Sequence, residues 1–228
     1  MKDETTVNGY FLVNNEWKQR NPKDSGYLSA TVENVEKVEN AVQNDPIYGR
    51  NGVELKHYLG MFPANNNHDT VIHKILLIDY TNSTNLRLYR KKGTSTFSLA
   101  DQIVAHSQEL DQMIQSGNPE AVRLIAGFGT VNLFSFATKY CCYHNTLCYE
   151  RDDYSIYDNI VADVIPSYLN IKRFYISQCR VKREYLEYKR IIDTLITVHG
   201  LQTVPQIRRK MDHFLWFSNR NIKRKAEQ

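Results

Sequence analysis

Apolar residues recur at intervals of three and four along most of this chain, and this spacing most strongly constrains its fold. Val32, Val35 and Val38 show it in the stretch from Thr31 to Val42. Such spacing places apolar side chains on one face of an α-helix, whereas a strand requires alternation with a period of two. Only ten glycines and six prolines interrupt the 228 residues. The pattern therefore predicts an all-α fold.

Capping residues, glycine and proline mark where the expected helices begin and end. The helices expected are residues 31–42, residues 70–79 after an Asp69 cap, residues 99–114 with a start at Ser98 and Asp101, residues 119–126 after Asn118, residues 130–144 after Thr130, residues 159–165 after Asp158, residues 178–199, and residues 204–218 after Thr203. One short helix within residues 44–67 and a short strand over Tyr10–Val13 are also expected. Residues 70–79 are apolar nearly all round, so their helix is expected to be central.

The aromatic content and the length set the size of the core. Fifteen Tyr, nine Phe and two Trp supply enough apolar area for a sizeable core, which excludes a disordered chain. A length of 228 residues suits one domain, so residues 1–228 are expected to form a single helical domain.

The chain carries no feature of a secreted, membrane-bound or metal-binding protein. No apolar stretch follows a basic start at the N-terminus, and no run of residues is apolar enough for a bilayer span, so a cytoplasmic location is expected. Cys141, Cys142, Cys148 and Cys179 are expected to be reduced thiols. The spacing of the first three around His144 fits no zinc or iron–sulfur pattern, so we expect no metal and no cofactor.

Positive charge is concentrated at the C-terminal end. Residues 171–228 contain 14 Lys and Arg against 5 Asp and Glu, whereas the rest of the chain has 15 against 20. Such a helical, basic C-terminal part attracts a phosphate backbone through counterion release. A solvated basic surface without a partner is the alternative. The expected DNA-binding residues are Arg180, Lys182, Arg183, Arg208, Arg209 and Lys210.

Lys139 and Asp158 are the residues best suited to chemistry. Lys139 is the only charged residue between Leu124 and Tyr149, and Phe136 and Tyr143 lie near it on the expected helix. Aromatic surroundings desolvate the ammonium, which lowers its pKa and increases the share of nucleophilic amine. Asp158 opens a helix, where backbone amides stabilise a carboxylate. A lysine that reaches water and an ordinary helix cap are the structural alternatives.

The two residues together resemble a known superfamily. Lys139 follows Thr138 and lies 19 residues before Asp158, which is flanked by aromatic residues and opens a helix. This arrangement resembles the helix-hairpin-helix DNA glycosylases, especially the 8-oxoguanine DNA glycosylase branch. The resemblance is concentrated in residues 118–166, which it identifies as a helix-hairpin-helix-like catalytic segment. It implies a two-lobed helical bundle with a cleft between the lobes.

The hairpin departs from the pattern of that superfamily. Its glycine hairpin usually lies immediately before the lysine, whereas here Lys139 comes ten residues after Gly129. If Gly127-Phe128-Gly129 is the hairpin, its amides can hold a phosphate, but Val131 takes the place of the lysine. If Lys139 sets the register, residues 134–137 replace the glycines. We prefer the second register because it keeps the spacing to Asp158, and a divergent archaeal-type branch also has an altered hairpin.

The resemblance implies a bifunctional DNA glycosylase and abasic-site lyase. A base flipped from double-stranded DNA is displaced by Lys139 at C1′, Asp158 stabilises the developing positive charge, and the resulting Schiff base allows strand cleavage. The partner implied is double-stranded DNA with a damaged or modified base, bound by a monomer in DNA repair or in defence against phage with modified DNA. The base-pocket candidates are Phe136, Tyr143, His144, Trp216 and Phe217.

Three alternatives remain open. In a monofunctional glycosylase, Asp158 activates water and Lys139 only binds. A non-catalytic helical nucleic-acid-binding protein uses the same basic C-terminal part without releasing a base. An adaptor uses that part to bind an acidic protein surface.

Overall fold

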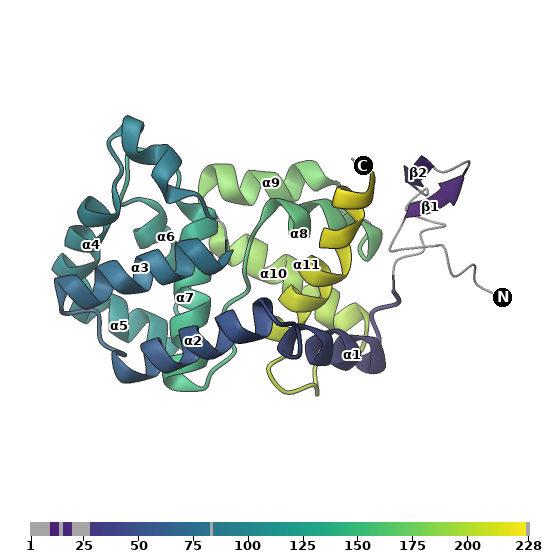
Figure 1. The fold of residues 1–228 in the computed structure, drawn as a ribbon, viewed down its shortest axis with the longest axis horizontal. Coiled ribbons are helices and arrows are strands. Elements are labelled where there is room, and N and C mark those ends of the chain that lie inside the picture. Colours follow the sequence, from purple (N-terminus) through teal and green to yellow (C-terminus); the bar gives the residue numbers. More distant parts are fainter. Residues whose placement is uncertain (1–9, 14–15, 20–27, 83, 227–228) are drawn as a thin grey trace.

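The computed structural model describes the backbone of residues 10–13, 16–19, 28–82 and 84–226, and the side chains of residues 28–82, 84–89 and 92–216. Within this part the fold is all-α apart from one hairpin of two antiparallel strands, and the expected strand is the first of them (Figure 1). The elements are β1 Tyr10–Val13, β2 Glu16–Gln19, α1 Val32–Gln43, α2 Tyr48–Met61, α3 His68–Asn82, η2 Leu86–Lys92, α4 Thr96–Ala105, α5 Ser107–Ser116, α6 Glu120–Ala126, α7 Phe134–Tyr149, α8 Asn159–Val164, η3 Ile165–Ser167, α9 Arg173–Lys182, α10 Tyr185–Val198 and α11 Ile207–Ala226.

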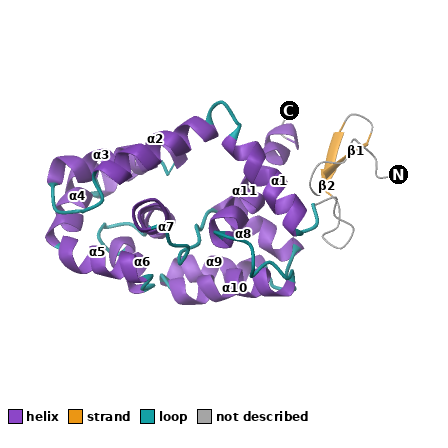
Figure 2. Cartoon of the chain, turned by 90° about the horizontal axis from the view of Figure 1, so that it is seen from below, coloured by secondary structure: helices purple, strands orange, loops and turns teal. Residues whose placement is uncertain are grey.

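Helix α7 is the central element of the fold. Twelve of its sixteen residues are buried. Figure 2 shows it nearly end-on, with the other helices arranged around it. A helix covered on all sides must be apolar or have its polar groups paired, and α7 contains Thr138, Lys139, His144 and Asn145 among its buried residues. The polar residues of the core are therefore concentrated on one helix.

The prediction that residues 70–79 form the central helix was wrong. On α3 the buried residues are Val71, Lys74, Ile75 and Ile78, and Leu76 is 47% exposed. Some of the apolar side chains of this helix therefore remain exposed to solvent. Its cap also differs from the prediction, because Asn67 rather than Asp69 accepts the hydrogen bond from the amide of Thr70.

Local capping signals gave the correct start for three helices. The side chain of Thr31 accepts a hydrogen bond from the amide of Asn34 and starts α1. Asn118 accepts one from the amide of Glu120 at the start of α6. Asp158 accepts one from the amide of Val161 and starts α8. Each of these caps lies within three residues of the amide that it binds, so sequence alone could identify it.

Two long helices that the sequence predicts are each divided in two. The expected helix of residues 99–114 breaks at His106, whose ring contacts Phe128 and the carbonyl of Gln102. The expected helix of residues 178–199 breaks at Arg183, which adopts a left-handed conformation with φ of 59°. Neither break contains the glycine or proline that usually marks a helix end.

At two helix starts, contacts between distant residues replace the cap that the sequence predicts. Thr130 does not cap α7, because its hydroxyl donates to the carbonyl of Lys92 and its amide donates to Thr94. The helix begins four residues later and runs to Tyr149. At the start of α11, the carboxylate of Asp152 accepts hydrogen bonds from the amides of Arg208 and Arg209 at 2.8 and 3.1 Å. The expected Thr203 cap was therefore wrong.

In the glycine-rich turn between α6 and α7, most backbone amides donate hydrogen bonds to acceptors within the chain. The amides of Gly127 and Phe128 donate to carbonyls of α6, and that of Thr130 donates to Thr94. A Cβ atom at Gly129 would lie 2.7 Å from the Thr94 hydroxyl, so this position requires glycine. Because most of its amides are occupied, the turn is poorly suited to hold a phosphate. This geometry argues against the register in which the glycines form a phosphate-binding hairpin.

All four cysteines are free thiols, as the sequence predicts. Among the described residues, no helix combines the length and the hydropathy that a bilayer span requires.

The same substitution at two glycines is expected to have opposite effects on stability. Gly117 has φ of 74°, and an added Cβ would lie 2.5 Å from the Asp153 side chain. Gly117→Ala should lower the free energy of unfolding by about 1–3 kcal/mol. Gly52 lies inside α2 with nothing near an added Cβ, so Gly52→Ala should raise it by about 0.5–1 kcal/mol. Urea unfolding of both variants measures the difference, and equal effects would contradict this account.

Candidate active site

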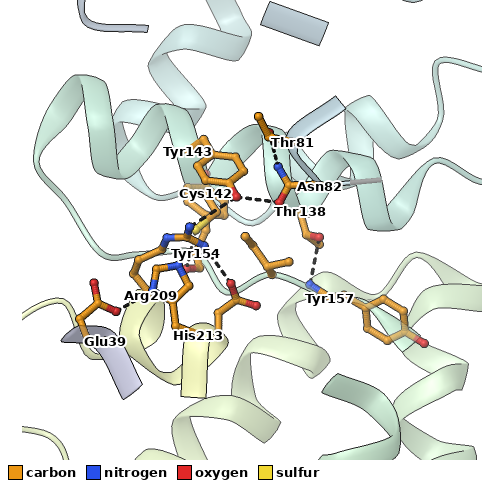
Figure 3. A network of polar contacts seen from close by, with 12 residues as sticks. Glu39, Thr81, Asn82, Thr138, Cys142, Tyr143, Tyr154, Tyr157, Arg209 and His213 are labelled. Carbon is orange, nitrogen blue, oxygen red and sulfur yellow. Dashed lines mark hydrogen bonds and ion pairs between the residues drawn. The ribbon is translucent and has the colours of Figure 1, made fainter. Parts of the chain in front are cut away.

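An extended segment before α8 is held against α7 by two side chains. The amide of Tyr157 donates to the Thr138 hydroxyl at 3.0 Å, and the Ser135 hydroxyl donates to the Tyr157 carbonyl at 2.9 Å. Figure 3 shows the contact between Thr138 and Tyr157. Both backbone polar groups of the residue before Asp158 are therefore bound to the helix that carries Lys139.

Two tyrosines of α10 bind the same segment. The Tyr185 hydroxyl accepts a hydrogen bond from the amide of Ser155 at 2.7 Å and donates to its carbonyl at 3.2 Å. The Tyr188 hydroxyl donates to the carbonyl of Ile156 at 2.6 Å. A buried segment without a strand beside it requires such partners, because unpaired backbone groups are costly in the core. These contacts fix where the chain enters α8.

Lys139 and Asp158 consequently line the same pocket. Its volume is about 500 Å³, and a smaller pocket of about 60 Å³ adjoins it and is lined by both residues too. The larger one is called the main pocket below, and the smaller one the side pocket. Residues from α2, α3, η2, α7, α8, α9 and α11 line the main pocket, among them Tyr48, Asn82, Leu88, Phe136, Lys139, Asp158, Arg180 and Trp216. The two residues that the sequence singles out as candidates for chemistry therefore border the same cavity.

The amine of Lys139 is set up to lose its proton. Its residue is only 5% exposed, and among the described residues it makes no hydrogen bond or ion pair. Burial lowers its pKa below the ordinary value, and the negative charge of Asp158 opposes this shift. A desolvated amine with a lowered pKa is the form of lysine that attacks carbon.

The pKa of the Asp158 carboxyl shifts in the opposite direction. Burial raises its pKa, and the charge of Lys139 and the amides of Val161 and Ile160 oppose the rise. The pKa values of the amine and the carboxyl therefore move towards each other. Shifts in these directions lower the cost of moving a proton from the amine to the carboxyl, and perturbed pKa values of this kind are found in acid–base pairs of active sites.

A buried polar network borders the side pocket (Figure 3). The Arg209 guanidinium forms an ion pair with Asp212 at 2.8 Å and lies 4.7 Å from the centre of the Tyr143 ring. The Tyr143 hydroxyl donates to Asn82 at 2.7 Å. His213, which lies on α11 with Arg209, bonds to Glu39 of α1 at 2.5 Å. Burial alone raises the pKa of Glu39, but the hydrogen bond and charge of His213 lower it to about 2. Four helices are joined by this network.

Asp212 is a candidate functional residue that the sequence did not reveal. Burial raises its pKa to about 7, while the charge of Arg209 opposes the rise. It lines the side pocket with Lys139 and Asp158, so a second carboxyl borders the cavity that contains the amine. Its only sequence signal is an isolated acidic residue in the basic part of the chain, and nothing local indicates that it is buried.

Three of the five base-pocket candidates line the pockets. Phe136 lines the main pocket, Tyr143 lines the side pocket, and Trp216 lines both, with its ring 5.2 Å from that of Tyr48. His144 does not belong to this site, because it is fully buried and its ring stacks on Tyr140 at 4.2 Å. A side chain one position further along a helix points about 100° away, which explains the difference between Tyr143 and His144. The Phe217 side chain lies outside the described residues.

The predicted DNA-binding residues fall into two groups. Arg180 lines the main pocket, Lys182 is exposed and Arg183 is half-buried. Arg208, Arg209 and Lys210 instead form ion pairs with Asp193, Asp212 and Glu36, and all three side chains are largely buried. The expectation that these three form part of an exposed basic face is corrected, because each is paired with an acidic side chain: Asp193 of α10, Asp212 of the same helix α11 and Glu36 of α1.

No group of three or more His, Cys, Asp or Glu side chains within the described ranges is arranged to hold a metal ion.

The sequence family follows from the chain's N-terminal half. The family of HI_0787 N-terminal domains matches residues 32–152, which is more than half of the 228 residues. The chain therefore belongs to this family. The matched segment begins with α1 and ends shortly after α7, so it contains Lys139 and stops before Asp158.

A protein of Haemophilus influenzae, described as an uncharacterized protein, is 26% identical to this chain over 119 residues. The match covers 50% of this chain and 53% of that protein, so the chain spans about half the length of the relative. No solved structure matches this chain.

Removing the Thr138 hydroxyl should release the segment that positions Asp158. In Thr138→Val the shape is retained, but the Tyr157 amide loses its acceptor. We expect the free energy of unfolding to fall by about 1–3 kcal/mol, which is the cost of a buried unpaired donor. Thr138→Ser keeps the hydroxyl and should lose less. Urea unfolding measures both, and a smaller loss for the valine variant would contradict this role.

Asp158→Asn should lower the pKa of Lys139 further. The negative charge of Asp158 opposes the effect of burial on Lys139, so the neutral amide removes that opposition. Asparagine still caps α8, so the helix is retained. Competitive amine labelling at a series of pH values, read by mass spectrometry, reports the protonation of Lys139. The exposed Lys56 in the same digests is the reference. An unchanged or raised Lys139 pKa would show that the two groups do not interact.

Proposed function

We propose that this protein is a DNA glycosylase that excises a damaged or modified base and then cleaves the abasic site through a lysine Schiff base. The observation that carries the proposal is the desolvated amine of Lys139 beside the carboxyl of Asp158 in a pocket of about 500 Å³. A lysine nucleophile requires an amine that can lose its proton, a carboxyl that can take it and room for a substrate, and the pocket combines a desolvated amine, a carboxyl and such a space. The resemblance to helix-hairpin-helix glycosylases supports the same assignment.

The reaction is derived from the two groups. Asp158 takes a proton from the Lys139 ammonium, and the neutral amine attacks C1′ of an extruded nucleotide. The C1′–N bond to the base breaks, and the base leaves with the bonding electrons and takes up a proton. The C1′–O4′ bond then breaks, O4′ takes up the proton that the amine nitrogen loses, and the opened sugar is joined to Lys139 by a Schiff base at C1′. Loss of a proton from C2′ then expels the 3′ phosphate, which cleaves the strand.

The lining of the pockets suits a flipped base. Phe136, Tyr143 and Trp216 offer aromatic surfaces, on which a base can stack. Asp212 and Asn82 place polar groups at the side pocket, where they can reach the edge of a base. The enzyme so proposed is a cytoplasmic monomer that acts on double-stranded DNA, in repair or in defence against phage with modified DNA.

Borohydride trapping tests the proposal directly. Duplex oligonucleotides with oxidised, deaminated, alkylated or glucosylated bases, and one with an abasic site, are incubated with the protein and sodium borohydride. We expect a covalent adduct, and peptide mapping should place it on Lys139. Lys139→Ala should lower adduct formation at least about a hundredfold, because the nucleophile is removed.

Lys56→Ala is the matched control, since it removes an exposed lysine that lines neither pocket. It should form the adduct as the unmodified chain does. Circular dichroism of all variants checks folding. Adducts spread over surface lysines, or no adduct with any of these DNAs, would refute the proposal. Base release that survives Lys139→Ala but not Asp158→Asn would assign the monofunctional reaction instead.

A further inference from the structure

The proposed function leaves one feature at the edge of the main pocket without a role. Leu88 lines the pocket and is nevertheless 64% exposed. It belongs to η2, whose sequence Leu-Arg-Leu-Tyr-Arg-Lys-Lys combines exposed apolar surface with four cations. An apolar side chain that is exposed to solvent beside a pocket can be buried by a molecule that binds there.

The segment that carries Leu88 is firmly anchored on both sides. Before it, Leu86 is buried and its amide donates to the Asp79 carboxylate at 3.0 Å. After it, the carbonyl of Lys92 accepts a hydrogen bond from the Thr130 hydroxyl, and Thr94 bonds to the amide of the same threonine. The backbone on both sides of Leu88 is therefore held in place by contacts with α3 and with the turn before α7.

Cations flank the leucine and the pocket. The side chains of Arg87 and Lys92 are exposed on η2, and no partner for either is present among the described residues. Arg180 of α9 lines the same pocket. The turn before α7 lies between these elements, because Thr130 bonds to η2 and the Asn132 side chain donates to the carbonyl of Arg180 at 2.7 Å.

We propose that η2 is the element that enters the DNA, with Leu88 as the wedge that fills the stack beside the extruded nucleotide and Arg87 and Lys92 as contacts to neighbouring phosphates. The inference rests on the proposed function. Proteins that kink a duplex commonly insert a leucine or another apolar side chain between bases, with cations beside it. Leu88 borders the cavity that would receive the nucleotide, so the space that opens in the DNA lies next to the side chain that fills it.

The test compares duplex and single-stranded DNA. One oligonucleotide with an abasic site is used in both forms, and the rate of borohydride-trapped adduct is measured. A wedge matters only where a nucleotide must leave a stack, so Leu88→Ala should slow trapping on the duplex about tenfold or more and on the single strand by less than about twofold. Equal losses on both would make Leu88 a wall of the pocket, and no loss on either would also overturn the proposal.

The control is Leu76→Ala, the same substitution at an exposed leucine of α3 that does not line the pockets. It should behave as the unmodified chain on both DNAs. A second readout needs no chemistry: 2-aminopurine opposite the abasic site fluoresces more when it is unstacked, and Leu88→Ala should remove the rise that the unmodified chain causes. No adduct from the unmodified chain on any DNA refutes the proposed function, and the fluorescence then decides the wedge by itself.

Salt dependence tests the phosphate contacts. The logarithm of the duplex binding constant falls with the logarithm of salt concentration in proportion to the phosphates neutralised. Arg87→Ala and Lys92→Ala should each reduce this slope by about 1, and the exposed Lys56→Ala should leave it unchanged. Slopes that do not change in the η2 variants would place the DNA on another face.

Discussion

The hydrogen bonds between α7 and the backbone of Tyr157 determine the geometry on which the site depends. Lys139 belongs to the helix and Asp158 follows Tyr157, so two side chains one and four positions before the lysine fix the distance between amine and carboxyl. Without these two hydrogen bonds, the buried amide and carbonyl of Tyr157 would be unpaired, and the extended segment would lose its polar contacts with α7 at this point. The pKa shifts follow from this placement, because shared burial lowers the pKa of Lys139 and raises that of Asp158, while the attraction between the two charges opposes both shifts.

Local signals predicted the helices and the central pair of residues but not the way the chain packs. The caps at Thr31 and Asp158 bind amides three residues away, so they could be identified from sequence. The cap of α11 is Asp152, more than fifty residues distant, and no local pattern contains it. The breaks at His106 and Arg183 carry no glycine or proline, so the divided helices were predicted as continuous ones.

The candidate site shows the same division between local and distant information. Lys139 and Asp158 could be identified from the sequence alone, because one is a single charge in an apolar stretch and the other is an acidic residue at an expected helix start. The burial of Asp212 and the pairing of Arg208 with Asp193 depend on which helices meet, so charge counting assigned Arg208 and Arg209 to the surface. Composition predicts how many cations a segment has, whereas tertiary contacts decide which of them remain available to a partner.

The extended segment that ends at Asp158 also has a consequence for solubility. Exposed strands with unpaired amides and carbonyls can recruit strands of other chains, and this risk is usually reduced by charges or by a covering helix. Here hydroxyls from Ser135, Thr138 and the α10 tyrosines occupy the backbone groups that a neighbouring strand would need. This segment therefore holds strand-like backbone in the interior with its hydrogen-bonding groups already occupied.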